Sequence, residues 1–192
     1  DLYVAFSLLA RWDGGWADHA RHAWSFVEAM WNETTGHFWT GTLADGITVN
    51  DTYHQIPLDA QAWAVLASPA SREYHRALDW AREHLWVEDL SCPQPISGYD
   101  FNPDLDGVWF EGVGQMGVAF KAIGDQDCAA ECLVALRSIQ SEPFPCAGGG
   151  IPAACRDGLT TGFDWEYNAR CCVAATCWYL FAEKAFNPYA PP

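Results

Sequence analysis

The chain has 192 residues, of which 50% are hydrophobic, and 25 acidic residues against 10 basic ones give a formal net charge of -15. It is long enough to bury a core, and we expect a single domain over residues 1–192. The negative charge disfavours nucleic acids and anionic membrane surfaces as partners, because few basic residues are present to neutralise phosphates. No apolar run approaches the roughly 20 residues of a membrane-spanning helix, so we expect a soluble chain without membrane insertion.

Apolar residues recur at three- and four-residue steps in successive segments, which predicts helices. The first two segments lie between residues 2 and 31 and separate at Asp13-Gly14-Gly15. A second pair covers 58–66 and 74–85, a third covers 108–123 and 127–139, and a last run covers 165–186. Because short loops alternate with long ones, the pattern predicts an all-α array of helical hairpins.

One long loop is expected to hold a small β-ribbon. Apolar and β-branched residues alternate weakly on both sides of Asp45-Gly46, a dipeptide that favours a tight turn between two strands. The ribbon would occupy residues 36–52, between the first and second helical hairpins.

Three long loops rich in glycine and aromatic residues lead into predicted helices: 36–56, 86–107 and 146–163. Asp59, Glu111 and Glu166 follow them at nearly even intervals, as in a stacked helical repeat. If each repeat is a hairpin, the loops emerge at one end and bring carboxylates and rings together. Sugars present flat C–H faces to rings and hydroxyls to carboxylates, so the pattern favours a carbohydrate site. The alternative is that the rings only fill the core.

Glycoside hydrolysis uses two carboxyl groups, one a protonated acid and the other a base or nucleophile. Glu111 is the first candidate for the acid, because the preceding Trp109 and Phe110 would desolvate it and raise its pKa. Asp164 ranks first as the second carboxylate, at a predicted helix start in an aromatic loop. The other candidates are Asp59, Asp104, Asp106 and Glu166. Capping of helix N-termini is the structural alternative for Asp59, Asp106 and Asp164.

Aromatic and polar residues near these carboxylates are candidates for substrate binding. Gln115 falls four residues after Glu111, so that both can face one side of a helix and share a ligand, or simply bond to each other. The candidates are Trp39, Tyr53, His54, Trp109, Gln115, Trp165, Glu166 and Tyr167.

A polysaccharide lyase is a lesser alternative. It would need a group that neutralises a uronate and a Tyr or His that removes the α-proton, and Tyr53, His54, Tyr167 and Arg170 supply these types. The acidic composition argues against such a polyanionic substrate.

Eight cysteines and two glycosylation sequons, at Asn32 and Asn50, favour an extracellular protein with some disulfides. Cys146 and Cys155 flank a glycine-rich loop and are the candidates for a disulfide that closes it. Most other cysteines, Cys171 among them, fall in helical patterns where a buried thiol is an equal alternative.

A run of oxygen-bearing side chains before Gly107 has the alternation of a calcium loop. Its members are Asp100, Asn102, Asp104 and Asp106. The run does not fit the full calcium-loop pattern. Counted from Asp100, Leu105 stands at the sixth position, where the loop needs glycine. Counted from Asn102, Val113 stands at the twelfth position, where the loop needs glutamate. A turn with helix-capping aspartates is the alternative. No cofactor other than calcium is expected.

Seven segments, read in order, resemble the C-terminal half of the six-hairpin glycosidase-like proteins, whose fold is an (α/α)6 toroid. They are 1–6, 38–42, 57–63, 107–112, 149–153, 161–163 and 178–182. The resemblance implies about half of a toroid of twelve helices, completed by the remainder of a longer chain or by packing against a second copy. It implies a carbohydrate partner and a glycoside hydrolase, while the same superfamily holds lyases, epimerases and non-catalytic members. The rival function is therefore a non-catalytic structural or glycan-binding module of an extracellular assembly.

Overall fold

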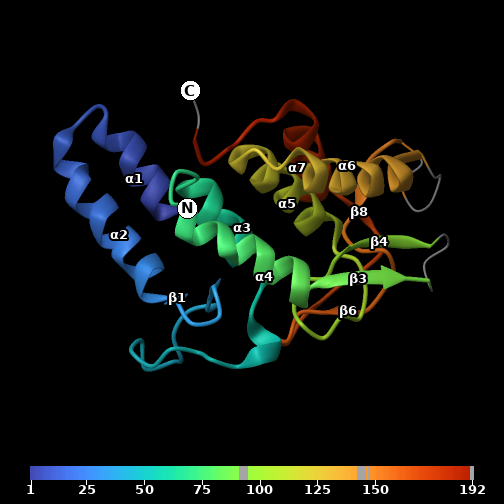
Figure 1. The fold of residues 1–192 in the computed structure, drawn as a ribbon, viewed down its shortest axis with the longest axis horizontal. Helices are drawn as coiled ribbons and strands as arrows, with labels where there is room; N and C mark the ends of the chain where they lie inside the picture. Colours follow the sequence, from blue (N-terminus) through green and yellow to red (C-terminus); the bar gives the residue numbers. More distant parts are fainter. Residues whose placement is uncertain (91–94, 142–145, 147, 191–192) are drawn as a thin grey trace.

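The computed structural model describes residues 1–90, 95–141, 146 and 148–190. Helices and short antiparallel strands alternate along this part of the chain (Figure 1). The α-helices are α1 (Leu2–Ala10), α2 (Ala17–Ala29), α3 (Leu58–Ala67), α4 (Arg76–His84), α5 (Phe110–Ile123), α6 (Gln126–Ser141) and α7 (Val173–Lys184). Three short 3-10 helices are η1 (Gly14–Trp16), η2 (Tyr53–Gln55) and η3 (Arg72–His75).

The helices form the antiparallel pairs that the periodicity predicts. α1 packs with α2, α3 with α4 and α5 with α6, while α7 lies against α5. The α5–α6 turn shows why the boundary falls where it does. Gly124 ends α5 with a φ of 89°, a left-handed conformation that costs glycine little, and Asp125 Oδ1 then accepts the backbone N–H of Cys128.

The fold is richer in strands than the predicted all-α array with one ribbon. Four two-stranded antiparallel sheets are present in the described residues. They pair β1 (Trp31–Asn32) with β2 (His37–Phe38), β3 (Trp86–Asp89) with β4 (Ile96–Tyr99), β5 (Ile151–Pro152) with β8 (Cys171–Cys172), and β6 (Leu159–Thr160) with β7 (Glu166–Tyr167). The predicted ribbon around Asp45-Gly46 reduces to one bridge between Thr42 and Val49.

The predicted start of the last helix at Trp165 is wrong. Residues 166–167 and 171–172 are strands, and α7 begins at Val173. The backbones of β7 and β8 pair with β6 and β5, so the segment satisfies its hydrogen bonds between strands. Tyr167 is consequently held at the edge of a small sheet and not on a helix.

One continuous hydrophobic core extends from Met30 to Ala182. The α1–α2 hairpin contributes little to it, since α1 buries no residue and α2 buries only Ala20. Figure 1 shows this hairpin at one side of the molecule, away from α5, α6 and α7. None of the helices in the described ranges combines the length and apolar character needed to cross a bilayer.

Candidate functional site

The starts of α3 and α5 pack closely together, and a glycine makes this approach possible. A Cβ added to Gly112 would lie 2.4 Å from Leu58 Cδ2 on α3 and 2.3 Å from the Trp109 ring. Asp59 follows Leu58, and Glu111 precedes Gly112, so the two carboxylates flank this contact. Both belong to the first turn of their helix, where the helix dipole favours a negative charge.

Partial burial makes the two carboxyl groups reluctant to ionise. Burial raises the pKa of Asp59 to about 6, with an additional rise from the charge of Glu111 and an opposing hydrogen bond from the backbone of Ala60. Burial also raises the pKa of Glu111, while a hydrogen bond from Gln115 opposes the rise. Burial therefore favours the protonated form of both carboxyl groups.

Gln115 lies one turn after Glu111 and contacts it, as the four-residue spacing predicts. Its Nε2 donates to Glu111 Oε1 at 3.4 Å. The Gln115 side chain is fully buried, and its Oε1 has no hydrogen-bond partner among the described residues. The amide thus orients one oxygen of Glu111 and favours its ionised form.

Aromatic rings from three distant segments surround the acid pair. Trp109 and Tyr167 stack with their centroids 5.3 Å apart, and Phe101 meets Trp109 edge-on at 4.9 Å. Burial raises the pKa of Tyr167, and the charges of Glu111 and Asp59 add to the rise. Burial also raises the pKa of Tyr189, in the segment after α7, and the charges of Asp59 and Glu111 add to this rise. Both phenols therefore lie close to the carboxylates.

Tyr189 follows Pro188 beyond the last helix, and no local pattern in the sequence points to it. Its ring lies 5.9 Å from Trp63, one turn after Asp59 on α3, and 6.4 Å from Trp178 on α7. Its hydroxyl donates to Asp1 Oδ1 at 2.8 Å. Tyr189 thereby links the end of the described chain to the helix that carries Asp59.

Asp164, the predicted second carboxylate, is exposed in the loop before β7. No hydrogen bond or ion pair in the described part of the chain connects it to Asp59 or Glu111. Glu166 is exposed on β7, while the neighbouring Trp165 is 49% exposed and packs edge-on against Tyr167 at 5.0 Å. The structure therefore brings Asp59 and Glu111 together and gives Asp164 no comparable contact.

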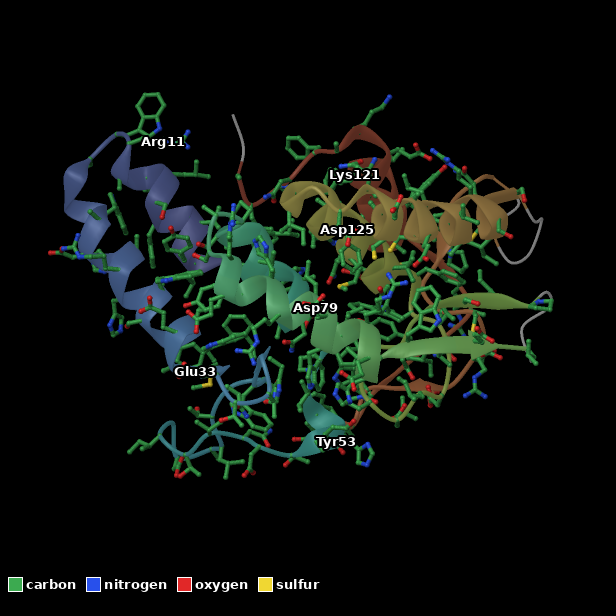
Figure 2. The ribbon with its side chains drawn as sticks, viewed as in Figure 1. Arg11, Glu33, Tyr53, Asp79, Lys121 and Asp125 are labelled. Atoms are coloured by element: carbon green, nitrogen blue, oxygen red, sulfur yellow. A yellow bond between two sulfur atoms is a disulfide. The ribbon has the colours of Figure 1, made fainter. Side chains whose placement is uncertain are left out.

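Two of the remaining predicted binding residues line a hollow that neither Asp59 nor Glu111 lines. Trp39 and Tyr53 line it together with His37, Trp80, Asp79 and His84. Figure 2 labels Asp79 on α4 and Tyr53 on η2, two of the segments that border it. His54 is exposed next to Tyr53, and its carbonyl oxygen packs against Gly162. His37 and His84 were missed, because they come from separate elements and form no local motif.

The aspartate-rich loop before α5 brings three carboxylates together. Ligand oxygens of Asp100, Asp104 and Asp106 lie within 4.8 Å of one another. Asp100 is fully buried, and it accepts backbone N–H groups of Phe101 and Asp106, each at 2.6 Å. Burial and the neighbouring Asp106 and Asp104 raise the pKa of Asp100 to about 8, against hydrogen bonds from the backbone.

Other groups already satisfy most of this loop. Asn102 Oδ1 accepts the backbone N–H of Asp104 at 2.8 Å, and Thr160 donates to both Asp104 and Asp106. The Arg156 guanidinium lies 3.9 Å from Asp106 Oδ2 and donates to the Asp106 carbonyl oxygen. These contacts fit the turn of the alternative interpretation, but not its helix capping. The N-cap of α5 is Trp109, and no side chain caps this helix. Asp106 Oδ1 is buried and accepts no hydrogen bond from the described residues.

The disulfide joins Cys146 to Cys171, not to Cys155 as expected. Cys171 lies on β8, so the bond ties the glycine-rich loop to the strand that precedes α7. Cys155 is buried, with its sulfur 3.3 Å from the backbone nitrogen of Val108. The expectation failed because Cys171 was assigned to a helical pattern, whereas the β5–β8 pairing places it next to Pro152.

The two sequons differ in accessibility. Asn50 is 8% exposed and its Nδ2 donates to Gln55 Oε1 at 2.8 Å, so a glycan on Asn50 would disrupt this packing. Asn32 is half-buried on β1, and its Oδ1 accepts the backbone N–H groups of Thr34 and Thr35. Its Nδ2 makes no hydrogen bond to another described residue, so Asn32 is the more accessible of the two sequon asparagines.

No protein-family model matches the chain, and no curated protein matches it.

Proposed function

We propose that the chain is a carbohydrate-active domain in which Asp59 and Glu111 are the two carboxyl groups of a glycoside hydrolase. The observation that carries this proposal is the close packing of the starts of α3 and α5, which places Asp59 and Glu111 on either side of the contact between Leu58 and Gly112. Burial there raises the pKa of both carboxyl groups. Two half-buried carboxyls on separate helices, bordered by aromatic rings, match the requirement for one protonated and one ionised group.

We assign Asp59 as the general acid and Glu111 as the base or nucleophile. This reverses the role expected for Glu111 from the sequence, because Gln115 donates to Glu111 and favours its ionised form. In the reaction, Asp59 would transfer its proton to the glycosidic oxygen as the bond to the anomeric carbon breaks. Glu111 would either attack that carbon or remove a proton from the water that does.

The aromatic rings beside the pair support a sugar substrate. Trp109, Tyr167 and Trp165 form a connected group, of which Trp165 is the most exposed. Trp109 is 1% exposed, so a sugar ring would stack on the exposed Trp165. The raised pKa of Tyr167 also disfavours this residue as the base of a lyase, because the phenol would resist the deprotonation that a catalytic base requires.

The half-toroid assignment fits the unequal burial of the helices. Leu2, Leu9, Trp12 and Phe26 of the α1–α2 hairpin and its turn are all at least 43% exposed. Further helices of a longer chain, or a second copy, would cover these side chains if the hairpin belongs to a larger toroid. The disulfide between Cys146 and Cys171 supports an oxidising, extracellular setting.

The test is hydrolysis of a panel of neutral and uronate-containing glycans by the native protein and three variants. Glu111→Gln and Asp59→Asn should each reduce turnover by about 10²-fold or more, since general acid–base catalysis contributes about that much. Asp164→Asn should leave turnover unchanged. Full activity in Glu111→Gln and Asp59→Asn would remove the pair from the mechanism. Glycan binding with no hydrolysis across the panel would favour the non-catalytic binding module.

A further inference from the structure

The hollow that Trp39 and Tyr53 line lies between β2 and α4, and we call it the His37 hollow. It has a volume of about 430 Å³ and is lined by residues of β1, β2, η2 and α4 with the intervening loops. That volume falls in the range of sites for small ligands, about 300 to 1,000 Å³. Neither Asp59 nor Glu111 lines it, so it is separate from the acid pair.

The buried residues of the His37 hollow are held by aromatic packing. His37 is 3% exposed and lies 4.6 Å from the Trp80 ring, while His84 stacks on the same indole at 4.7 Å. Trp39 meets His37 edge-on at 4.3 Å. These contacts fix the His37 ring with little rotational freedom.

One nitrogen of His37 has no partner. Its Nδ1 lies 2.7 Å from Thr35 Oγ1, while its Nε2 is buried with no hydrogen bond among the described residues. Burial lowers the pKa of His37 to about 4, and the nearby His84 adds to this effect. The ring is therefore neutral at physiological pH. A buried polar atom without a partner costs free energy, so a ligand that bonds to Nε2 would relieve this cost.

The rim of the hollow is polar and acidic. Asp79 and Glu83, one turn apart on α4, are both exposed and line it. Arg76 also lines it, but its guanidinium donates to the carbonyl oxygens of Glu33 and Thr34 at 2.9 and 3.5 Å. The cation is thus engaged with the β1–β2 turn, and the two carboxylates would repel an anionic ligand.

We propose that the His37 hollow binds a neutral sugar unit, with hydroxyls bonded to His37 Nε2 at the base and to Asp79 and Glu83 at the rim. Tyr53, 47% exposed, supplies a ring at the edge, and its hydroxyl lies 3.3 Å from His84 Nδ1. A neutral sugar can both donate to carboxylates and bond to an imidazole of either tautomer, which a simple cation cannot.

A metal ion is a poorer fit to the same residues. In the described part of the chain, three potential metal ligands converge within 4.8 Å in the cluster of Asp100, Asp104 and Asp106. None of these residues lines the His37 hollow. His37, His84 and the two carboxylates would have to move together before they could share an ion. The sugar requires no such convergence, because its hydroxyls are spread over the ring.

The test is a titration of the ¹⁵N resonances of the histidine rings with neutral disaccharides, galacturonate oligomers and tetramethylammonium. At least one neutral disaccharide should shift the His37 signals saturably, with no equivalent shift from the other two probes. The double variant Asp79→Asn, Glu83→Gln should weaken this binding by about tenfold or more, since hydrogen bonds to charged groups are lost. Glu88→Gln, an exposed carboxylate on β3 outside the hollow, is the matched control and should bind as the native protein does.

Asp59→Asn separates this site from the proposed hydrolase. That variant should keep the His37 shift whether or not it loses turnover, so this site can fail or stand independently of the hydrolase proposal. The inference is overturned if no neutral disaccharide shifts His37 saturably, or if tetramethylammonium or the uronates bind there instead. It is also overturned if the double variant binds as tightly as Glu88→Gln, or if Asp59→Asn abolishes the shift.

Discussion

The charge of Glu111 lies close enough to Asp59 to help raise its pKa, although burial of Asp59 is the larger cause. The two residues start different helices, and the contact between Leu58 and Gly112 brings those starts together. A single substitution at this contact should therefore affect both carboxylates. Gly112→Ala is expected to separate α3 from α5 and to reduce turnover as well as stability.

Asp59 should make the stability of the fold depend on pH. Its pKa rises from 3.8 in the unfolded chain to about 6 in the fold, so the folded state retains a proton that the unfolded state releases. The stabilisation is fully present below about pH 3.8 and is lost as the pH rises through about 6. When the pH is raised from about 4 to 7, the free energy of unfolding in urea should fall by roughly 2 kcal/mol more in the native protein than in Asp59→Asn. Parallel pH profiles for the two proteins would contradict this.

The disulfide should contribute measurably to stability. Cys146 and Cys171 are separated by 25 residues, and closing a loop of this size stabilises a fold by about 3 kcal/mol, mainly by restricting the unfolded chain. Cys146→Ser should lower the free energy of unfolding by about that amount in denaturant titrations under non-reducing conditions. Cys177→Ser, at a half-buried cysteine of α7 outside this disulfide, is the control. Equal losses in both variants would argue against a structural role for the bond.

Gly162 joins the loop before β7 to η2. A Cβ at this position would lie 1.8 Å from the His54 carbonyl oxygen, and the φ of 73° is unfavourable for other residues. Gly162 also accepts a hydrogen bond from Gln55 Nε2 at 2.9 Å. Gly162→Ala should therefore lower the free energy of unfolding, measured by thermal or chemical denaturation, by more than about 2 kcal/mol.

Gly149→Ala is the matched control for that substitution. Gly149 has a similar φ of 77°, but nothing lies within 4 Å of an added Cβ. Its cost should be limited to the backbone strain, about 1 to 2 kcal/mol. If both variants lose the same stability, the close approach of Gly162 to His54 is not a constraint on the fold.

Calcium should bind the aspartate loop weakly while Arg156 is present. The guanidinium lies beside Asp106, and Thr160 donates to two of the carboxylates, so a cation would compete with existing contacts. Millimolar calcium should leave the melting temperature of the native protein unchanged. Arg156→Gln should bind calcium more tightly in calorimetry, because it removes the competing charge. Stabilisation of the native protein by micromolar calcium, reversed by a chelator, would contradict this.

The helix pairs could be predicted because their apolar periodicity is local, and glycines or acidic residues mark their boundaries. The strands could not be predicted as well, since each is two to four residues long and depends on a partner distant in sequence. Trp165 to Cys172 was assigned to a helix because aromatic and apolar residues run continuously into α7. Pairing of β7 with β6 and of β8 with β5 overrides that pattern.

Part of the candidate site could be predicted, because it lies on one helix and its pattern is local in the sequence. Glu111 and Gln115 are four residues apart on one helix, and this spacing indicates a common face. Trp109 directly precedes the same helix. The sequence offers both Asp59 and Asp164 as the partner carboxylate, because helix-start position alone does not distinguish them. Only the packing of α3 on α5 does so. Tyr189 and His37 depend entirely on tertiary contacts.

Carboxyl ¹³C titration of Asp59 tests the central claim most directly, because it needs no knowledge of the substrate. The account predicts a pKa of about 6 for Asp59 in the native protein. It predicts a lower value in Glu111→Gln that still exceeds 3.8, since burial remains after the charge is removed. An ordinary pKa near 3.8 in the native protein, or one that Glu111→Gln leaves unchanged, would show that the two carboxylates do not share a desolvated site.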